Sequence, residues 1–483
     1  MKNIPNVMII FGGSGDLAHR KLYPALFNLY RKGLIADNFA VIATARRPWS
    51  HDFLSWSSKK IAINETCEQV DAADLDRFAT HFYYQSHDVT HVDHYIALKQ
   101  LAQKLDEKYD CHGNRIFYMA MAPSFFGTIA THINDQKLLG TGFNRLIVEK
   151  PFGRDYETAE KLNQEIGASF DEKSVYRIDH YLGKEMIQNI LPLRFANPLL
   201  KNIWNAEYIK NIQVTLAEKI GVGTRGGYYD NSGALRDMVQ NHIFQIITLL
   251  AMPAPKNLTS DAIHEAKQRL LQGLQIPSYD EVSKSVVRGQ YLASEHEPAY
   301  INVDQVAPDS CTETYVAGKV KFTTGPLAGV PIYFRTGKKM LEKKSRIDIV
   351  LKAGSDLYEK ANENVITIEI DPVSKIVLRL NGKEIVGTGL RIEDLSYAFN
   401  AEEMHQVPDG YERLLNDVFM ADRTNFTHWM ELAQYWRYID AIESAWRKQN
   451  SMAIKPDQYL PNAFGPNAAD NIFENADSYW IYR

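Results

Sequence analysis

An apolar run followed at once by a glycine-rich turn and a helical pattern opens the chain, and this arrangement restricts the fold more than any other feature. Val7–Phe11 is continuously apolar, as expected for a buried strand. Gly12–Ala18 contains the spacing G-x-G-x-x-A, and leucines then recur at helical spacing. Small residues between a strand and a helix let the backbone approach a pyrophosphate at the helix N-terminus. The sequence therefore predicts a dinucleotide-binding βαβ unit.

The first third of the chain contains further apolar runs of the same kind, which are separated by helical patterns. These runs are Phe39–Ala43, Ile116–Ala120, Leu146–Val148 and Val175–Ile178. Unbroken apolar character is typical of a parallel sheet that helices cover on both faces. We therefore expect an α/β Rossmann domain over residues 1–179, with the boundary near residues 178–200.

From about residue 205 the pattern changes to alternation, which indicates strands with two different faces. Residues 212–216 and 347–351 alternate in this way. Asn381-Gly382, between two apolar runs, predicts a two-residue hairpin turn, and Tyr411–Arg447 is mainly helical in pattern. Residues 180–483 should therefore form a larger α+β domain with a mainly antiparallel sheet.

The composition excludes several classes of partner. Fifty-four Lys and Arg against 59 Asp and Glu give a net charge of −5, so no global basic field attracts nucleic acid. The most apolar stretch, Ile243–Met252, is too short to span a membrane. The three cysteines have no metal-ligand spacing. We expect a cytoplasmic protein without a metal, in which local clusters of cations bind any anionic ligand.

The end of the second predicted strand bears on the choice of cofactor. It reads Thr44-Ala45-Arg46-Arg47, with no acidic residue. An acid at this place usually binds the ribose 2′-hydroxyl of NAD, whereas the 2′-phosphate of NADP requires cations. The arginines therefore favour NADP, with NAD as a weaker or second cofactor. The alternative is a solvated basic loop.

Three groups of polar residues indicate a substrate site. If a helix begins at Asp179, His180 and Lys184 share one face of it and could bind a phosphate; the alternative is a simple N-cap with a solvated lysine. In a later helix, His242 lies on the apolar face, where it is either a core residue or a general base paired with Asp179. Arg335–Arg346 carries six cations against one acid, which is either a solvated face or an anion site.

Together, these motifs closely resemble those of the glucose-6-phosphate dehydrogenase family. The Asp179–Glu185 stretch is highly specific to that family, whereas Glu149-Lys150-Pro151 is shared with other sugar dehydrogenases. The other matching segments are Gly15–Leu17 with Lys21–Pro24, Ala122-Pro123, Phe125–Gly127, Gly233–His242 and Arg335–Lys343. The resemblance covers most of the chain.

The resemblance implies the oxidation of glucose 6-phosphate to 6-phosphogluconolactone, with the C1 hydride passing to nicotinamide C4. His242 would be the base, and Asp179 would orient it. The implied substrate ligands are Lys150, His180, Tyr181, Lys184, Glu218, Asp237, Lys338 and Lys343. The implied cofactor ligands are Gly12, Gly13, Ser14, Gly15, Asp16, Leu17, Arg46, Asp88, Val89 and Lys150. The resemblance also implies a homodimer or homotetramer.

Two other functions fit part of the sequence. A sugar oxidoreductase similar to glucose–fructose oxidoreductase could share the glycine-rich turn and the Glu-Lys-Pro element, but it would not need His180, Lys184 or the late lysines. A non-catalytic NADP-binding sensor could keep the fold, but we would expect it to have lost Asp179 or His242. Both residues are present here.

Overall fold

The computed structural model describes residues 4–35, 37–51, 71–295, 297–354, 357–358 and 361–483. The chain divides into two compact units. The first contains Met1–Gly183 together with Pro408–Trp429, and the second contains Lys184–Val407 together with Met430–Arg483. Each unit has its own sheet, and the two units are described separately below.

The first unit contains a seven-stranded sheet in the order β15-β6-β5-β4-β1-β2-β3. The strands are β1 (Asn6–Phe11), β2 (Phe39–Ala45), β3 (Phe82–Ser86), β4 (Arg115–Met119), β5 (Asn144–Val148), β6 (Val175–Ile178) and β15 (Phe426–Thr427). Strands β1–β6 are parallel, and only β15 is antiparallel. The strand order reverses between β1 and β4, which is where dinucleotides bind in folds of this kind.

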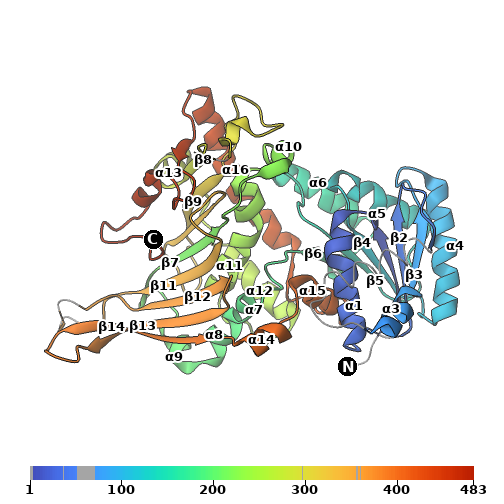
Figure 1. The fold of residues 1–483 in the computed structure, drawn as a ribbon, viewed down its shortest axis with the longest axis horizontal. Coiled ribbons are helices and arrows are strands. Elements are labelled where there is room, and N and C mark those ends of the chain that lie inside the picture. Colours follow the sequence, from blue (N-terminus) through green and yellow to red (C-terminus); the bar gives the residue numbers. More distant parts are fainter. Residues whose placement is uncertain (1–3, 36, 52–70, 296, 355–356, 359–360) are drawn as a thin grey trace. The chain divides into compact units, whose positions relative to one another are not determined.

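Helices cover both faces of this sheet (Figure 1). One face carries η1 (Ala18–Leu22, a π-helix), α1 (Tyr23–Arg31), α3 (Ala72–Ala79) and α15 (Gly410–Phe419). The other face carries α4 (Val92–Tyr109), α5 (Phe126–Asp135) and α6 (Tyr156–Gly167). The strands are buried on both sides, and this explains their unbroken apolar sequences.

The segment that returns to the first unit late in the chain was not expected from the sequence. Leu415 and Val418 of α15 are fully buried in the same core as strands β1 and β2. The Arg145 guanidinium donates hydrogen bonds to the carbonyl oxygens of Val418 and Phe419, at 2.6 and 3.0 Å. These carbonyls lie in the last turn of α15, where backbone acceptors lack partners further along the helix, and the Val418 carbonyl also accepts from the Ala421 amide at 3.2 Å. The arginine adds hydrogen bonds to both carbonyls and fixes the segment to β5.

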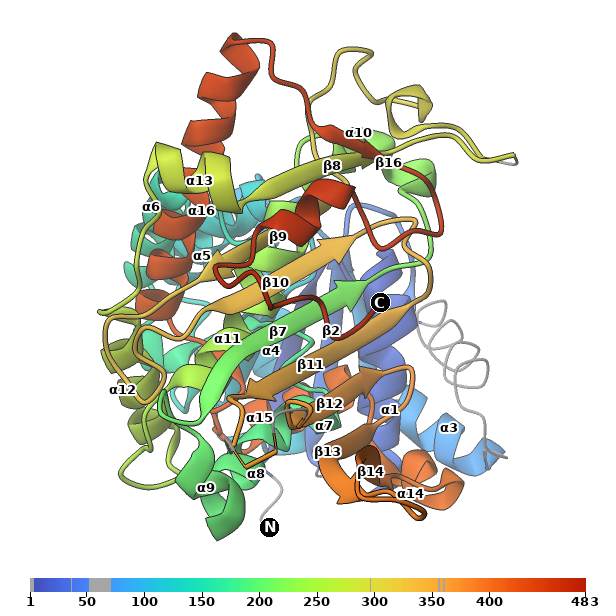
Figure 2. The same ribbon diagram turned by 90° about the vertical axis from the view of Figure 1, so that its left-hand side faces the viewer.

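The second unit contains a nine-stranded sheet in the order β14-β13-β12-β11-β7-β10-β9-β8-β16 (Figure 2). The strands are β7 (Ile209–Ala217), β8 (Val287–Tyr291), β9 (Tyr315–Val320), β10 (Ile332–Gly337), β11 (Lys344–Leu351), β12 (Val365–Asp371), β13 (Lys375–Lys383), β14 (Leu390–Ala398) and β16 (Asp457–Tyr459). Most neighbours are antiparallel, but β7 and β10 are parallel, as are β8 and β16. The predicted fold class is confirmed.

Helices pack behind this sheet, and the end of the chain crosses its front (Figure 2). The longer helices are η5 (Leu235–Ile243, a π-helix), α11 (Phe244–Ala251), α12 (Ser260–Leu271) and α16 (Trp429–Ser451). The shorter ones are α7 (Glu185–Gln188), α8 (Ile190–Ala196), α9 (Pro198–Ile203), α10 (Gly226–Tyr229), α13 (Tyr279–Ser285) and α14 (Ala401–Gln406). In the described part of the chain, none of the helices combines the length and apolar character needed to cross a membrane.

The predicted hairpin turn at Asn381-Gly382 is wrong, because β13 continues through both residues. Asn381 pairs with Ile392 of β14, and its side chain exchanges hydrogen bonds with the backbone of Asn362 at 2.7 and 2.9 Å. The chain reverses after β13, where the Glu384 amide donates to the Gly389 carbonyl at 2.9 Å. A side-chain partner outside the hairpin therefore outweighs the turn preference of Asn-Gly.

Candidate active site

The glycine-rich turn after β1 lies so close to its neighbours that only glycine fits. Gly12 has a φ of +90°, and a Cβ there would lie 2.3 Å from the Ala120 carbonyl oxygen. A Cβ on Gly13 would lie 2.6 Å from the Cβ of Ala43. The amides of both glycines donate to the Thr44 carbonyl at 2.9 Å. The ends of three neighbouring strands thus set the shape of the turn.

A cavity of about 410 Å³ adjoins this turn. It is lined by residues at or just after the ends of β1, β2, β3 and β4: Gly12, Ser14, Gly15, Thr44, Ala45, Arg46, Arg47, His87, Asp88, Val89, Thr90, Met121 and Phe125. Six of the predicted cofactor ligands are among them, and Thr44, Thr90 and Met121 were not predicted. The cavity lies where the strand order reverses, as expected for a dinucleotide site.

The other four predicted cofactor residues lie elsewhere in the first unit, and one of them, Lys150, lines a second cavity described below. Gly13 is buried beneath the turn. The carboxylate of Asp16 is exposed and pairs with Arg20 at 2.8 Å. Leu17 also lines that second cavity.

The charged groups around the first cavity fit a phosphorylated dinucleotide. Arg46 and Arg47 are exposed at the end of β2, and the Arg47 guanidinium lies 5.5 Å from the ring centre of Trp49. Burial and the neighbouring His94 lower the pKa of His87 to about 4, so its imidazole is neutral at pH 7. A glycine cradle, an adjacent helix N-terminus and two exposed arginines together suit the phosphate groups of a dinucleotide.

A second cavity of about 370 Å³ follows the ends of β4, β5 and β6. It is lined by Leu17, Ala120, Met121, Glu149, Lys150, Ile178, His180 and Tyr411. The predicted residues Lys150 and His180 therefore lie at one cavity. Tyr411, which comes from the returning segment, was not predicted.

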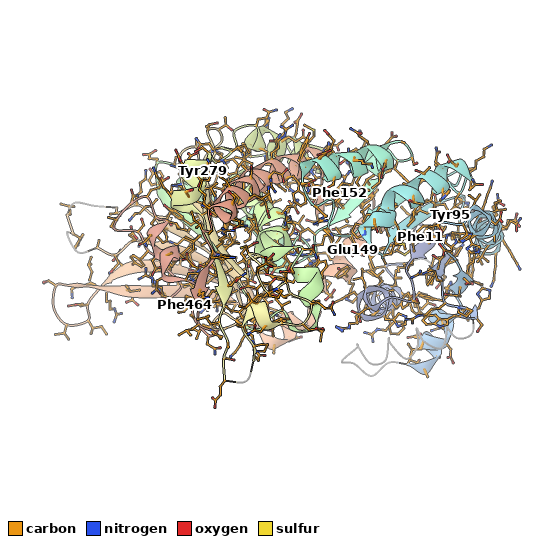
Figure 3. The ribbon with its side chains drawn as sticks, turned by 90° about the horizontal axis from the view of Figure 1, so that it is seen from above. Phe11, Tyr95, Glu149, Phe152, Tyr279 and Phe464 are labelled. Carbon is orange, nitrogen blue, oxygen red and sulfur yellow. The ribbon has the colours of Figure 1, made fainter. Side chains whose placement is uncertain are left out.

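Glu149, labelled in Figure 3, follows β5 directly; it is mostly buried and lines this second cavity. The Tyr118 hydroxyl donates to its Oε1 atom at 2.6 Å, and Tyr411 also hydrogen-bonds to it. Burial raises the pKa of Glu149, and both hydroxyls oppose this shift by stabilising the carboxylate. Two tyrosines thus hold the residue that precedes Lys150 in a fixed position.

The stretch after β6 is a turn, so the predicted helix beginning at Asp179 is wrong. The Tyr181 amide donates to Asp179 Oδ1 at 2.9 Å, and the Leu182 amide donates to the Asp179 carbonyl at 3.0 Å. A Cβ on Gly183 would lie 2.5 Å from the Gly410 carbonyl oxygen. The chain therefore turns tightly here, and α7 begins only after Lys184. His180 and Lys184 do not share a helix face.

In the second unit, His242 lies on η5 and is 1% exposed. The predicted apolar face exists, since Leu235, Val239, Ile246 and Leu249 are also buried. However, the first part of this helix, η5, is a π-helix. Its turns are wider than the α-helical turns expected from the sequence.

Two parallel strands and η5 bring three predicted residues together. Glu218 follows β7 and Lys338 follows β10, and these strands are paired in parallel up to Ala217 and Gly337. Lys338 is 2% exposed, and its ammonium pairs with the carboxylate of Glu218 and, at 3.6 Å, with that of Asp237. This group has two carboxylates for one ammonium, so some carboxylate oxygens can accept hydrogen bonds from hydroxyl groups.

A second charged group in this unit contains two cations and one acid. The Asp371 carboxylate lies 3.3 Å from the Lys184 ammonium and 2.8 Å from that of Lys343. Burial favours the neutral acid, but Lys343 and Lys184 nevertheless hold the pKa of Asp371 below its ordinary value. The group therefore carries a net positive charge. Asp371 was not predicted, although it ends β12.

The predicted cation patch Arg335–Arg346 is not a single surface patch. Arg335 is 1% exposed, and its guanidinium lies 4.3 Å from the ring centre of Trp480. Arg346 pairs with Asp348. Only part of the run, including Lys343, is solvated.

Models of two known domains match nearly the whole chain. Residues 9–189 match "Glucose-6-phosphate dehydrogenase, NAD binding domain", and residues 191–481 match "Glucose-6-phosphate dehydrogenase, C-terminal domain". The chain belongs to the glucose-6-phosphate dehydrogenase family. The resemblance inferred from the motifs is thus confirmed, and the chain is an oxidoreductase of this family with a dinucleotide-binding domain.

Full-length members of this family are similar to the chain. Glucose-6-phosphate 1-dehydrogenase of Streptococcus pneumoniae is 43% identical over 99% of this chain and 97% of its own length. The Bacillus subtilis enzyme is 42% identical over 98% of each chain. A solved structure of glucose-6-phosphate dehydrogenase in complex with its substrate glucose 6-phosphate is 30% identical, with a TM-score of 0.88 over 98% of this chain and 99% of that one.

Gly12→Ala should weaken NADP binding at least about tenfold, because the new Cβ would displace the turn from Ala120. Gly33→Ala is the matched control. Gly33 also has a positive φ, +64°, but nothing lies within 4 Å of its added Cβ. Both variants should lose about 1–2 kcal/mol of stability from the left-handed backbone. Fluorescence titration with NADPH measures the difference, and equal affinities for the two variants would contradict the prediction.

Proposed function

We propose that this protein oxidises D-glucose 6-phosphate to 6-phospho-D-glucono-1,5-lactone and reduces NADP, the first step of the oxidative pentose phosphate pathway. The match of the whole chain to this family carries the proposal. The local chemistry supports it, since the chain has a dinucleotide cradle, a net positive group of lysines and a buried histidine. We also propose that the protein is cytoplasmic and forms a homodimer or homotetramer.

In this proposal His242 removes the proton of the C1 hydroxyl and Asp179 orients the imidazole. An imidazole has an ordinary pKa of ~6.5, so it can accept a proton at neutral pH. Both side chains are at least 98% buried, and burial strengthens the interaction of a carboxylate with an imidazolium. Asp179 thereby favours the charged form that His242 acquires in the reaction.

The two charged groups of the second unit would have different tasks. Lys184 and Lys343 share one carboxylate, and their net positive charge suits the 6-phosphate, with His180 and Tyr181 as further donors. Glu218 and Asp237 would accept hydrogen bonds from sugar hydroxyls, and Lys338 would hold these two carboxylates in place.

The first unit would bind the cofactor. NADP, when bound, accepts the C1 hydride at nicotinamide C4. The turn Gly12–Gly15 would hold the pyrophosphate, Arg46 would bind the 2′-phosphate, and Asp88-Val89 would lie along the adenosine. Lys150 lines the second cavity and would contact both the nicotinamide end and the sugar. Because hydride transfer forms no covalent intermediate with the protein, these residues act mainly by orientation.

Absorbance at 340 nm, with glucose 6-phosphate or glucose and with NADP or NAD, tests the proposed function. We expect rapid reduction of NADP with glucose 6-phosphate and almost none with glucose. Equal efficiency on both sugars would favour the alternative oxidoreductase for unphosphorylated sugars. Binding of NADPH without turnover of any sugar phosphate would favour the sensor.

His242→Asn should lower kcat by about 10²–10⁴-fold while leaving the affinity for glucose 6-phosphate nearly unchanged, because a base acts in the transition state. Steady-state kinetics and calorimetric binding measure the two effects. His112→Asn is the control, since His112 is an exposed histidine of the first unit. A variant at 242 that kept most of its rate would exclude this residue as the base.

Arg46→Ala should raise the KM for NADP by about tenfold to a hundredfold, because a charged hydrogen bond to the 2′-phosphate is lost. The KM for NAD should change little, since NAD lacks that phosphate. Arg391→Ala, which removes an exposed arginine of the second unit, is the control. Equal losses with both cofactors would show that Arg46 does not read the 2′-phosphate.

A further inference from the structure

The helix that carries the proposed base has an unusual turn. Asp237 and His242 are five residues apart within the π-helix η5, and the Phe244 amide after it reaches back to the Val239 carbonyl, also five residues away. In an α-helix, residues five apart point about 140° away from each other. In a π-helix the wider turn brings residues five apart much closer to the same direction. The wide turn therefore places Asp237 and His242 on one side of the helix.

The side chain of Asn241 joins the two ends of this turn. Its Nδ2 atom donates to the Arg236 carbonyl oxygen at 3.1 Å, and its Oδ1 atom accepts from the His242 amide at 2.6 Å. Arg236 immediately precedes Asp237, so the amide group spans the segment that separates the two functional side chains. A π-helix is rarely stable by itself, and it persists where the surroundings determine it.

We infer that Asn241 is a positioning residue, which acts by holding the π-turn beneath the imidazole of His242. The inference rests on the proposed function, in which His242 is the base. Without the Asn241 amide, the turn can tighten toward an α-helix, and the imidazole would rotate relative to Asp237. A displacement of about 1 Å at a reacting group can reduce the rate by about a hundredfold.

The main experiment is Asn241→Ala in the full-length protein. We expect kcat to fall by about tenfold to a hundredfold, while the calorimetric Kd for glucose 6-phosphate stays within about twofold. Asn241→Asp keeps an acceptor for the His242 amide but loses the donor to Arg236, so its kcat should fall less. This second variant also serves if the alanine variant does not fold.

Asn205→Ala is the matched control. The Asn205 side chain makes the same two kinds of bond, since it donates to the Asn202 carbonyl at 2.9 Å and accepts from the Glu207 amide at 2.8 Å. It lies between α9 and β7, outside η5. The kcat of Asn205→Ala should stay within about twofold of that of the wild type. An equal loss of kcat in the control would show that the effect is general destabilisation and would overturn the inference.

The double variant Asn241→Ala with His242→Asn separates this inference from the proposed function. If Asn241 acts through His242, its loss should cost little once the base is absent. An additive loss, a kcat for Asn241→Ala within twofold of the wild type, or a Kd that rises in parallel with the loss of kcat would each overturn the inference. A His242→Asn variant that alone kept its rate would overturn the base assignment, and with it the positioning role.

Discussion

Parallel strands end at the same edge of a sheet, and many residues of the proposed site follow such an end. In the first unit, Gly12, Arg46, Asp88, Lys150 and His180 come within two residues of the ends of β1, β2, β3, β5 and β6. The two cavities of this unit lie at the same edge. The pairing of backbone amides and carbonyls therefore gathers side chains that are far apart in the sequence, before any side chain interacts with another.

The second unit applies the same constraint within a mainly antiparallel sheet. The parallel pair β7 and β10 brings Glu218 beside Lys338, and η5 adds Asp237 to them. Two acids around one buried lysine give a group that is net negative. Two lysines around Asp371 give one that is net positive. In a chain with a net charge of −5, this local balance gives the proposed phosphate site a net positive charge and the proposed hydroxyl site a net negative charge.

Local sequence patterns predict local structure in this chain. They fail where contacts between residues far apart in the sequence determine the conformation. The strand, the glycine-rich turn and the following helix were predicted because apolar runs and small residues act over a few positions. The return of Tyr411 to the first unit depends on Arg145, which binds the end of α15 from 273 residues away in the chain. The turn after Asp179 depends on the close approach of Gly183 to Gly410. No periodicity in the sequence encodes either contact.

The π-helix η5 shows the same division between local and distant causes. Its sequence reads as an ordinary amphipathic helix, and the prediction of a buried face was correct. Residues distant in the sequence contact the start of this wider turn. The Leu235 amide donates to the buried carboxylate of Glu313 at 2.8 Å, and the Arg236 guanidinium lies 3.1 Å from Glu443. These contacts hold the first residues of η5, and the Asn241 side chain links Arg236 to the His242 amide within the helix. A π-helix, which propensity alone disfavours, is therefore found where the proposed chemistry uses Asp237 and His242, five residues apart, together.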